Sequence, residues 1–282
     1  MSQNTARSQV KEDLPAPAQA PAVPPKKKFT STKAFERSLA VLTPVALLLI
    51  WEVLGRLGVI DTRFFPVPSA IVEQMFALSE SGELWSNVWA STRRLFIGFW
   101  LGLVPALILG VVMGLYRPIR AALQPLVSGT YPIPKSALLP LILLIFGLGE
   151  TSKVVMVAIG VFYPVVINTV AGVMNVAPMY YDVAKNFGAS RWHVFKTVAI
   201  PGAMPNIMTG IELGAGLGLI LIAIAEMVGA DSGLGYMIWN AWQLYSVETM
   251  YVGLLVIAVI GYALALLLGA VSNRLTPWRA DR

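Results

Sequence analysis

The sequence from Leu95 to Tyr116 reads LFIGFWLGLVPALILGVVMGLY and contains no charged residue. As a helix it would be about 33 Å long, enough to cross the roughly 30 Å hydrocarbon core of a bilayer. Small residues recur at every fourth position on one face: Gly98, Gly102, Ala106, Gly110 and Gly114. Such a row lets a second helix approach closely, which favours association inside a membrane. The stretch therefore predicts a membrane-spanning helix that packs tightly against a neighbour.

The rest of the chain has the same membrane character. Of its 282 residues, 56% are hydrophobic and 13% are charged, whereas a soluble domain carries about 25% charged residues. Five further apolar segments are long enough to span a bilayer: 38–57, 121–147, 153–174, 203–228 and 249–272. We therefore expect an all-α, polytopic membrane helical bundle of about six transmembrane helices over residues 38–275. This composition excludes an ordinary soluble enzyme.

Two segments depart from the regular pattern. Segment 121–147 contains four prolines, and the backbone groups that they free must be shielded by protein or line a cavity. Segment 67–92 is too polar to span a membrane. Its apolar residues follow a rough helical stripe, which predicts a short amphipathic helix on the outer surface or packed on the bundle.

Several kinds of chemistry are excluded by residue type. The chain has no cysteine and a single histidine, His193, so thiolate nucleophiles, disulfides and multi-histidine metal sites are ruled out. The glycine-rich sequence from Gly147 to Lys153 lacks the spacing of a phosphate-binding Walker loop. We therefore expect no catalytic residue, no bound metal and no nucleotide on this chain. A nucleophile elbow is also missing, which argues against an intramembrane enzyme.

The distribution of Lys and Arg predicts the topology. Seven lie in residues 1–37, two at 117 and 120, three in loop 175–202 and three after 272, against five on the other side. The positive-inside rule then places both termini in the cytoplasm. Residues 1–37, rich in Pro, Ala and charge, predict a disordered cytoplasmic tail, and residues 276–282 a short one. The net charge of +6 thus indicates orientation and not nucleic-acid binding.

Four charged residues fall within or near the spans: Glu52, Lys135, Glu212 and Glu226. A charge at the bilayer centre is costly, so such residues are candidates for function. Lys135, Glu212 and Glu226 are our candidates for the substrate pathway, and a cation at mid-depth would attract an anion. The alternative is that they form structural ion pairs between helices. Glu52 and Glu226 are expected to lie close enough to a boundary to reach water.

The loop at residues 179–201 predicts a docking element. Residues 179–187 favour a short helix, Gly188 suits its left-handed stop, and Ser190 suits the N-cap of a second helical piece that ends at Pro201. In that piece Trp192 and Phe195 share one face. A helix–turn–helix with one apolar side fits a groove in a partner protein.

The same loop resembles the EAA motif of bacterial ABC importer permeases. The matching positions are Asp182, Val183, Ala184, Gly188, Val198, Ile200 and Pro201. Asp and Val here replace the usual Glu and first Ala. The wider sequence is similar to permeases of the sulfonate/nitrate/taurine family, in segments 65–69, 131–141, 146–150 and 225–235.

The resemblance implies a type I ABC importer (MetI-like) fold in the bacterial cytoplasmic (inner) membrane. Two copies of the permease would form the pore, two cytoplasmic ATP-binding subunits would hold ATP and Mg, and an extracytoplasmic solute-binding protein would deliver the solute. The chain would be a transporter subunit and not an enzyme, with membrane lipid around it. The ATPase-coupling residues would be Asp182, Ala184, Lys185, Phe187, Gly188, Ala189, Arg191, Trp192 and Pro201. The solute would be a small oxyanion of the sulfonate/taurine, nitrate or bicarbonate class, with a sulfonate favoured.

The alternative is a self-sufficient secondary carrier of a small anion. Such a carrier has no need of the docking loop, and the two halves of the chain show no evident inverted repeat of the kind many carriers contain.

Overall fold

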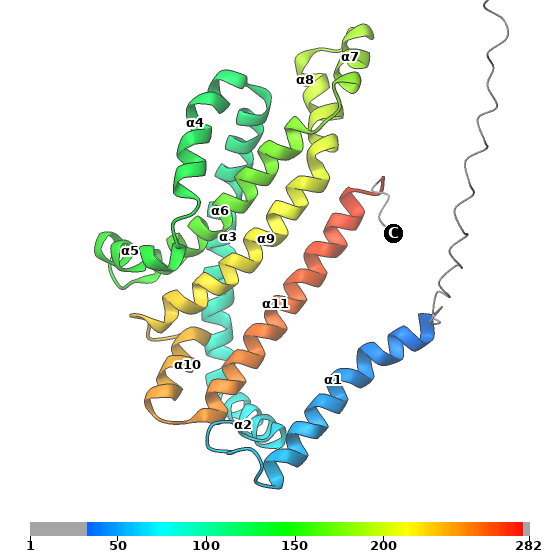
Figure 1. The fold of residues 1–282 in the computed structure, drawn as a ribbon. Coiled ribbons are helices and arrows are strands. Elements are labelled where there is room, and N and C mark those ends of the chain that lie inside the picture. Colours follow the sequence, from blue (N-terminus) through cyan, green and yellow to red (C-terminus); the bar gives the residue numbers. More distant parts are fainter. Residues whose placement is uncertain (1–32, 279–282) are drawn as a thin grey trace, which may run out of the picture. The chain divides into compact units, whose positions relative to one another are not determined.

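The computed structural model describes residues 33–278, and all the regular structure in that range is helical (Figure 1). Most of the predicted N-terminal tail and the last four residues lie outside it. The chain divides at Leu48 into two units. The first helix, α1 (Lys33–Arg56), begins before the predicted residue 38, and its part up to Leu48 belongs to the first unit. The remaining elements belong to the second unit.

Three long helices form the core of the second unit: α3 (Glu83–Leu115), α6 (Glu150–Met174) and α9 (Ile200–Met227) (Figure 1). Helix α6 packs against both of the others along its length. The small residues of α3 face α6, since a Cβ added at Gly98 would lie 2.6 Å from the Cβ of Val157. The predicted close packing of this span is therefore confirmed.

Helix α9 approaches α6 in the same way. A Cβ at Gly210 would lie 2.8 Å from the Cβ of Asn168, and one at Gly214 would lie 3.1 Å from the carbonyl oxygen of Val161. Val161 and Val165 of α6 have no exposed surface. The glycines of both outer helices thus bring three backbones together around a core of valines.

The segment with four prolines is a broken span. Helix α4 (Arg117–Thr130) is followed by the 3₁₀ turn η1 (Lys135–Leu138) and helix α5 (Leu139–Phe146), and the two halves are bent by 89°. Five helices are long and apolar enough to cross a membrane, or six if this bent pair counts as one. The expectation of about six spans, one of them irregular, is confirmed.

The segment at 67–92 is not one helix. It forms α2 (Pro68–Glu80) and then, after Gly82 with φ +79°, the first turns of α3. Ile71 and Leu78 of α2 are buried against the bundle, in a cluster that includes Leu84. The backbone N–H of Ser69 donates to Glu52 at 3.0 Å, so this carboxylate holds the N-terminal turn of α2.

The remaining helices are α7 (Pro178–Asn186), α8 (Arg191–Val194), α10 (Leu234–Gln243) and α11 (Val247–Leu275). A π-helical turn, η2 (Phe195–Ala199), joins α8 directly to α9. The second helical piece of the loop was expected to end at Pro201. It instead continues into the span. Pro201 has no N–H to donate, and it lies just after the π-helical turn, where the α-helical hydrogen-bond pattern changes.

Candidate functional site

The helical hairpin formed by α7 and α8 has defined ends. Gly188 has φ +73°, its N–H donates to the Lys185 carbonyl at 2.8 Å, and the Ala189 N–H donates to the Ala184 carbonyl at 3.0 Å. This pair of bonds is the Schellman arrangement that ends a helix at a left-handed residue. The predicted helix stop at Gly188 is thus confirmed.

The second helix of the hairpin begins as expected. The Ser190 hydroxyl accepts a hydrogen bond from the His193 N–H at 3.3 Å, as an N-cap does. The rings of Trp192 and Phe195 stack with their centroids 5.2 Å apart, which places them on one face. The backbone therefore fixes the angle between α7 and α8 without help from another chain.

The predicted coupling residues lie on this hairpin, except Pro201, which is the second residue of α9. Phe187 is 87% exposed and Trp192 is 71% exposed. Asp182, Lys185 and Arg191 are also exposed, whereas Ala184, Ala189 and Pro201 are half-buried. Two large apolar side chains ringed by charged ones are typical of an interaction surface.

A second cluster of polar residues is buried beside the N-terminal half of α3. The Arg94 guanidinium is 1% exposed and pairs with Glu226 of α9 at 2.9 Å. It also pairs with Glu150 at the start of α6 and donates to the Ser232 carbonyl at 2.6 Å. Sequence reasoning counted Arg94 only as an outer positive charge. The sequence offered one indication that Arg94 is buried: it stands directly before the uncharged span that begins at Leu95.

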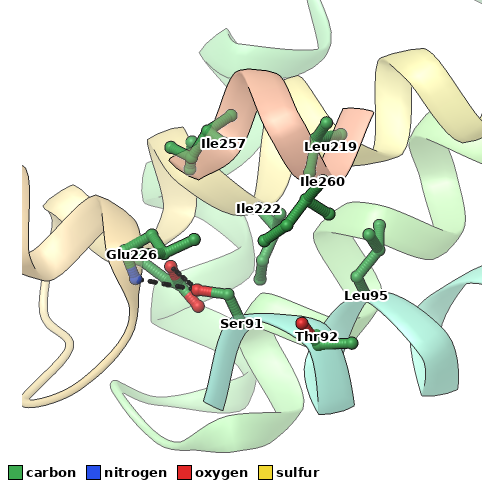
Figure 2. A pocket seen from close by; sticks show the side chains of 10 residues that line it. Ser91, Thr92, Leu95, Leu219, Ile222, Glu226, Ile257 and Ile260 are labelled. Atoms are coloured by element: carbon green, nitrogen blue, oxygen red, sulfur yellow. Dashed lines mark hydrogen bonds between the residues drawn. The ribbon is translucent and has the colours of Figure 1, made fainter. Parts of the chain in front are cut away.

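Glu226 is fully satisfied within this cluster. Its second oxygen accepts from the Ser91 hydroxyl at 2.7 Å (Figure 2). The same oxygen accepts from the Gly235 N–H at 3.0 Å. A side chain at Gly233, which has φ +113°, would collide with the carboxyl group. The expectation that Glu226 reaches water is wrong, because the chain turns back after Met227 into α10 and covers it.

The loop between α9 and α10 is held by a second cation. The Lys153 ammonium is buried and donates to the carbonyls of Leu148, Gly149 and Gly229. Arg94 and Lys153 together bind this loop to the ends of α3 and α6. We name these two residues with Ser91, Glu150 and Glu226 the ion cluster. All its donors and acceptors are paired, so it serves as a rigid clamp.

Beside the ion cluster lies a small cavity of about 10 Å³, room for about one water molecule. Figure 2 shows the side chains that line it: the polar ones of Ser91 and Glu226, and apolar ones that include Leu95, Ile257 and Ile260. This space is far too small for a solute.

The other two pathway candidates, Lys135 and Glu212, have different surroundings: Lys135 has hydrogen-bond partners and Glu212 is exposed. The Lys135 ammonium donates to the carbonyls of Thr130, Tyr131 and Ile133 at 3.0, 2.9 and 3.0 Å, and lies 4.0 Å from the centre of the Tyr163 ring. All three of its N–H groups are therefore used to close the end of α4. Glu212 instead lies exposed on α9, with no ion pair among the described residues.

No group of three or more metal-ligating side chains occurs within residues 33–278. Within the described range, no hydrogen bond or ion pair joins any two of the three pathway candidates. The α7–α8 hairpin lies at the opposite end of the bundle from the α9–α10 loop (Figure 1). The molecule thus presents an exposed hairpin at one end and a clamped loop at the other.

Comparison with known proteins identifies the family. Residues 106–279 match the family described as binding-protein-dependent transport system inner membrane component. The chain is 33% identical to the taurine transport system permease protein TauC of Escherichia coli K12, covering 86% of this chain and 90% of that protein. It is also 33% identical to the putative aliphatic sulfonates transport permease protein SsuC of Bacillus subtilis, covering 90% and 92%.

The fold is similar to that of solved importers. The chain aligns with the inward-facing MetNI methionine ABC transporter at a TM-score of 0.59 and 20% identity, covering 68% of this chain and 96% of that one. It aligns with an amino acid ABC transporter at a TM-score of 0.55 and 20% identity, covering 72% and 97%. The expected type I importer fold is confirmed, and this chain belongs to the family of binding-protein-dependent transport system inner membrane components.

Proposed function

We propose that this chain is the membrane subunit of an ATP-driven importer for a small sulfonate-class solute such as taurine or an alkanesulfonate. The exposed hairpin carries the proposal, because Phe187 and Trp192 offer apolar surface at a position where α7 and α8 are held rigidly. The names of the most similar relatives support the solute class. Nitrate and bicarbonate remain the other oxyanions that the family resemblance implies.

In this proposal the hairpin lodges in a groove of a cytoplasmic ATPase subunit. Phe187 and Trp192 are the buried anchors, and Asp182, Lys185 and Arg191 make polar contacts around them. The π-helical turn joins the hairpin to α9 without a loop. Movement of the ATPase would therefore be passed along α9 to the ion cluster, which binds α3, α6 and the α9–α10 loop into one body.

A second copy of the chain would complete the pore. Glu212, Leu213, Leu217 and Ile220 lie exposed along one face of α9. A carboxylate facing lipid at mid-span costs at least about 2.5–3.5 kcal/mol. We therefore place this face of α9 against the second copy and the pathway between the copies. Of the three pathway candidates, Glu212 is the one that we keep on the pathway, whereas Lys135 and Glu226 have structural partners.

The proposed orientation has both termini in the cytoplasm and the ion cluster at the extracytoplasmic end. The excess of Lys and Arg in the tail, in loop 175–202 and after residue 272 supports it. An extracytoplasmic solute-binding protein would then meet the α9–α10 end of the bundle. ATP and Mg would be held by the ATPase subunits and not by this chain.

Co-purification tests the proposal. The tagged chain is isolated from native membranes in mild detergent, and the proteins that accompany it are identified by mass spectrometry. We expect a Walker-motif ATPase in about equal amount, together with a solute-binding protein whose ligand can then be screened. Repeated recovery of the chain alone, with uptake that needs no ATPase, would overturn the proposal in favour of the secondary carrier.

A further inference from the structure

A large groove lies between the C-terminal end of α3 and the α7–α8 hairpin. Its volume is about 770 Å³, within the range of small-molecule sites in proteins. One wall is a stripe on a single face of α3, and the other wall comes from α8 and η2. The α3 wall consists of Leu107, Ile108, Val111, Val112 and Leu115.

The lining of this groove changes in a regular order along α3. The floor is wholly apolar, since it is formed by Leu107 and Ile108 of α3 and by Phe195 and Ala199 of the opposite wall. Towards the hairpin, side chains with an apolar body and a polar tip follow: Tyr116, Tyr181 and Trp192.

The rim of the groove is basic. Lys185 and Arg191 both line it, and none of its lining residues is acidic. The Tyr181 phenol also lines the groove. A tyrosine hydroxyl is neutral at neutral pH and can donate a hydrogen bond to an anion. The lining thus runs from an apolar floor through aromatic side chains to a basic rim. A bilayer leaflet has the same order, from acyl chains through the interface to the phosphates.

We propose that this groove binds an anionic phospholipid, with an acyl chain along α3 and the phosphate between Lys185 and Arg191. These two side chains and Trp192 would then lie between the lipid and the ATPase and touch both. Charge complementarity and the order of the lining select this occupant. The inference rests on the orientation given under the proposed function, which puts the groove in the cytoplasmic leaflet, where anionic headgroups meet the basic rim.

A lipid in this position would have a consequence for coupling. It would contact α3 on one side and the hairpin on the other, and so would fill the space between the core of the bundle and the element that meets the ATPase. The content of anionic lipid in the membrane would thereby tune how firmly the hairpin follows the rest of the subunit.

Native mass spectrometry of the whole detergent-solubilised transporter tests this proposal. Dioleoylphosphatidylglycerol and dioleoylphosphatidylcholine are added in turn, and the lipid retained per permease chain is counted. Two basic groups at the headgroup should favour the anionic lipid about 30-fold. Equal retention of the two lipids would overturn the proposal.

Variants locate the binding. The pair Lys185→Gln and Arg191→Gln should reduce the preference for the anionic lipid to about one, whereas the pair Lys196→Gln and Arg274→Gln, exposed basic residues outside the groove, should leave it unchanged. Val112→Trp should lower retention of both lipids about tenfold by filling the groove. Leu144→Trp, at a side chain that is 82% exposed elsewhere, should not.

Other occupants give different results. Preference for the anionic lipid in permease chains released from the ATPase, but not in the whole transporter, would assign the groove to the ATPase. Because the native chain has no cysteine, a disulfide between two copies of Val112→Cys would assign it to the second copy. Either result would overturn the lipid proposal. ATPase subunits in the spectrum of the unaltered transporter support the proposed function whatever the lipid result, so the two failures can be told apart.

Discussion

Arg94 is the residue on which the α9–α10 end of the subunit depends. Its guanidinium is shared by two carboxylates, one buried in α9 and one half-exposed at the start of α6. Desolvation of such groups is offset only because every donor and acceptor is paired. Removal of Arg94 leaves the Glu226 carboxylate buried without its charged partner.

We therefore expect Arg94→Met to destabilise the subunit by about 3–5 kcal/mol, the usual result of breaking a buried ion pair from one side. The adjacent Arg93 provides the matched control. It pairs with the same Glu150, but its side chain is 50% exposed, so Arg93→Met should cost at most about 1 kcal/mol. Thermal unfolding in detergent measures both variants, and equal effects would refute the clamp.

Gly188 is the second residue with a specific task, because it alone gives the hairpin its left-handed turn. Valine at φ +73° would be strained by about 1–2 kcal/mol, and no neighbouring atom lies within 4 Å to cause a clash. Gly188→Val should therefore lower transport and ATPase stimulation while membrane insertion stays normal.

The control for this variant is Gly58→Val. Gly58 has φ +71° and also has open space around it, but it lies outside the hairpin. It should show the same strain without uncoupling. Substrate-stimulated ATPase activity of proteoliposomes separates the two variants, and normal stimulation in Gly188→Val would remove the hairpin from the coupling mechanism.

At the scale of elements, the contact between α3 and α6 decides the packing. A Cβ at Gly102 would lie 2.9 Å from the Cβ of Val161 and closer still to the Ala158 carbonyl oxygen. Gly102→Val should therefore push the helices apart and destabilise the subunit by about 1–3 kcal/mol. Gly269→Val on α11, where nothing lies within 4 Å, should be nearly neutral. Thermal unfolding compares them, and equal midpoints would contradict close packing.

The sequence could predict this element-scale packing because its cause is local. Glycines four residues apart form one face of a helix wherever that helix lies. Gly188 ends α7 and Ser190 starts α8 through hydrogen bonds within the hairpin itself. Helix α10 was missed because its apolar run is too short to mark a span and its position depends on α3. The burial of Glu226 could not be predicted for the same reason, since only the return of the chain into α10 covers it.

At the scale of the whole molecule, the two ends of the second unit differ in kind. One end carries an exposed hairpin with the aromatic side chains of Phe187 and Trp192 on its surface, and the other carries a loop fixed by Arg94 and Lys153. Helix α9 runs between them. This asymmetry suits a subunit that receives force at one end from an ATPase and accepts a solute at the other from a binding protein.

The most direct test of this account is site-specific cross-linking in the assembled transporter. Because the chain lacks cysteine, Phe187→Cys introduces one thiol on the hairpin, and Tyr245→Cys introduces one at the opposite end, where the native side chain is 89% exposed. Each is labelled with a photoactivatable cross-linker, and the products are identified by mass spectrometry. The account predicts that Phe187→Cys cross-links to the ATPase and Tyr245→Cys does not. Cross-linking of the ATPase from Tyr245→Cys, with none from Phe187→Cys, would contradict it.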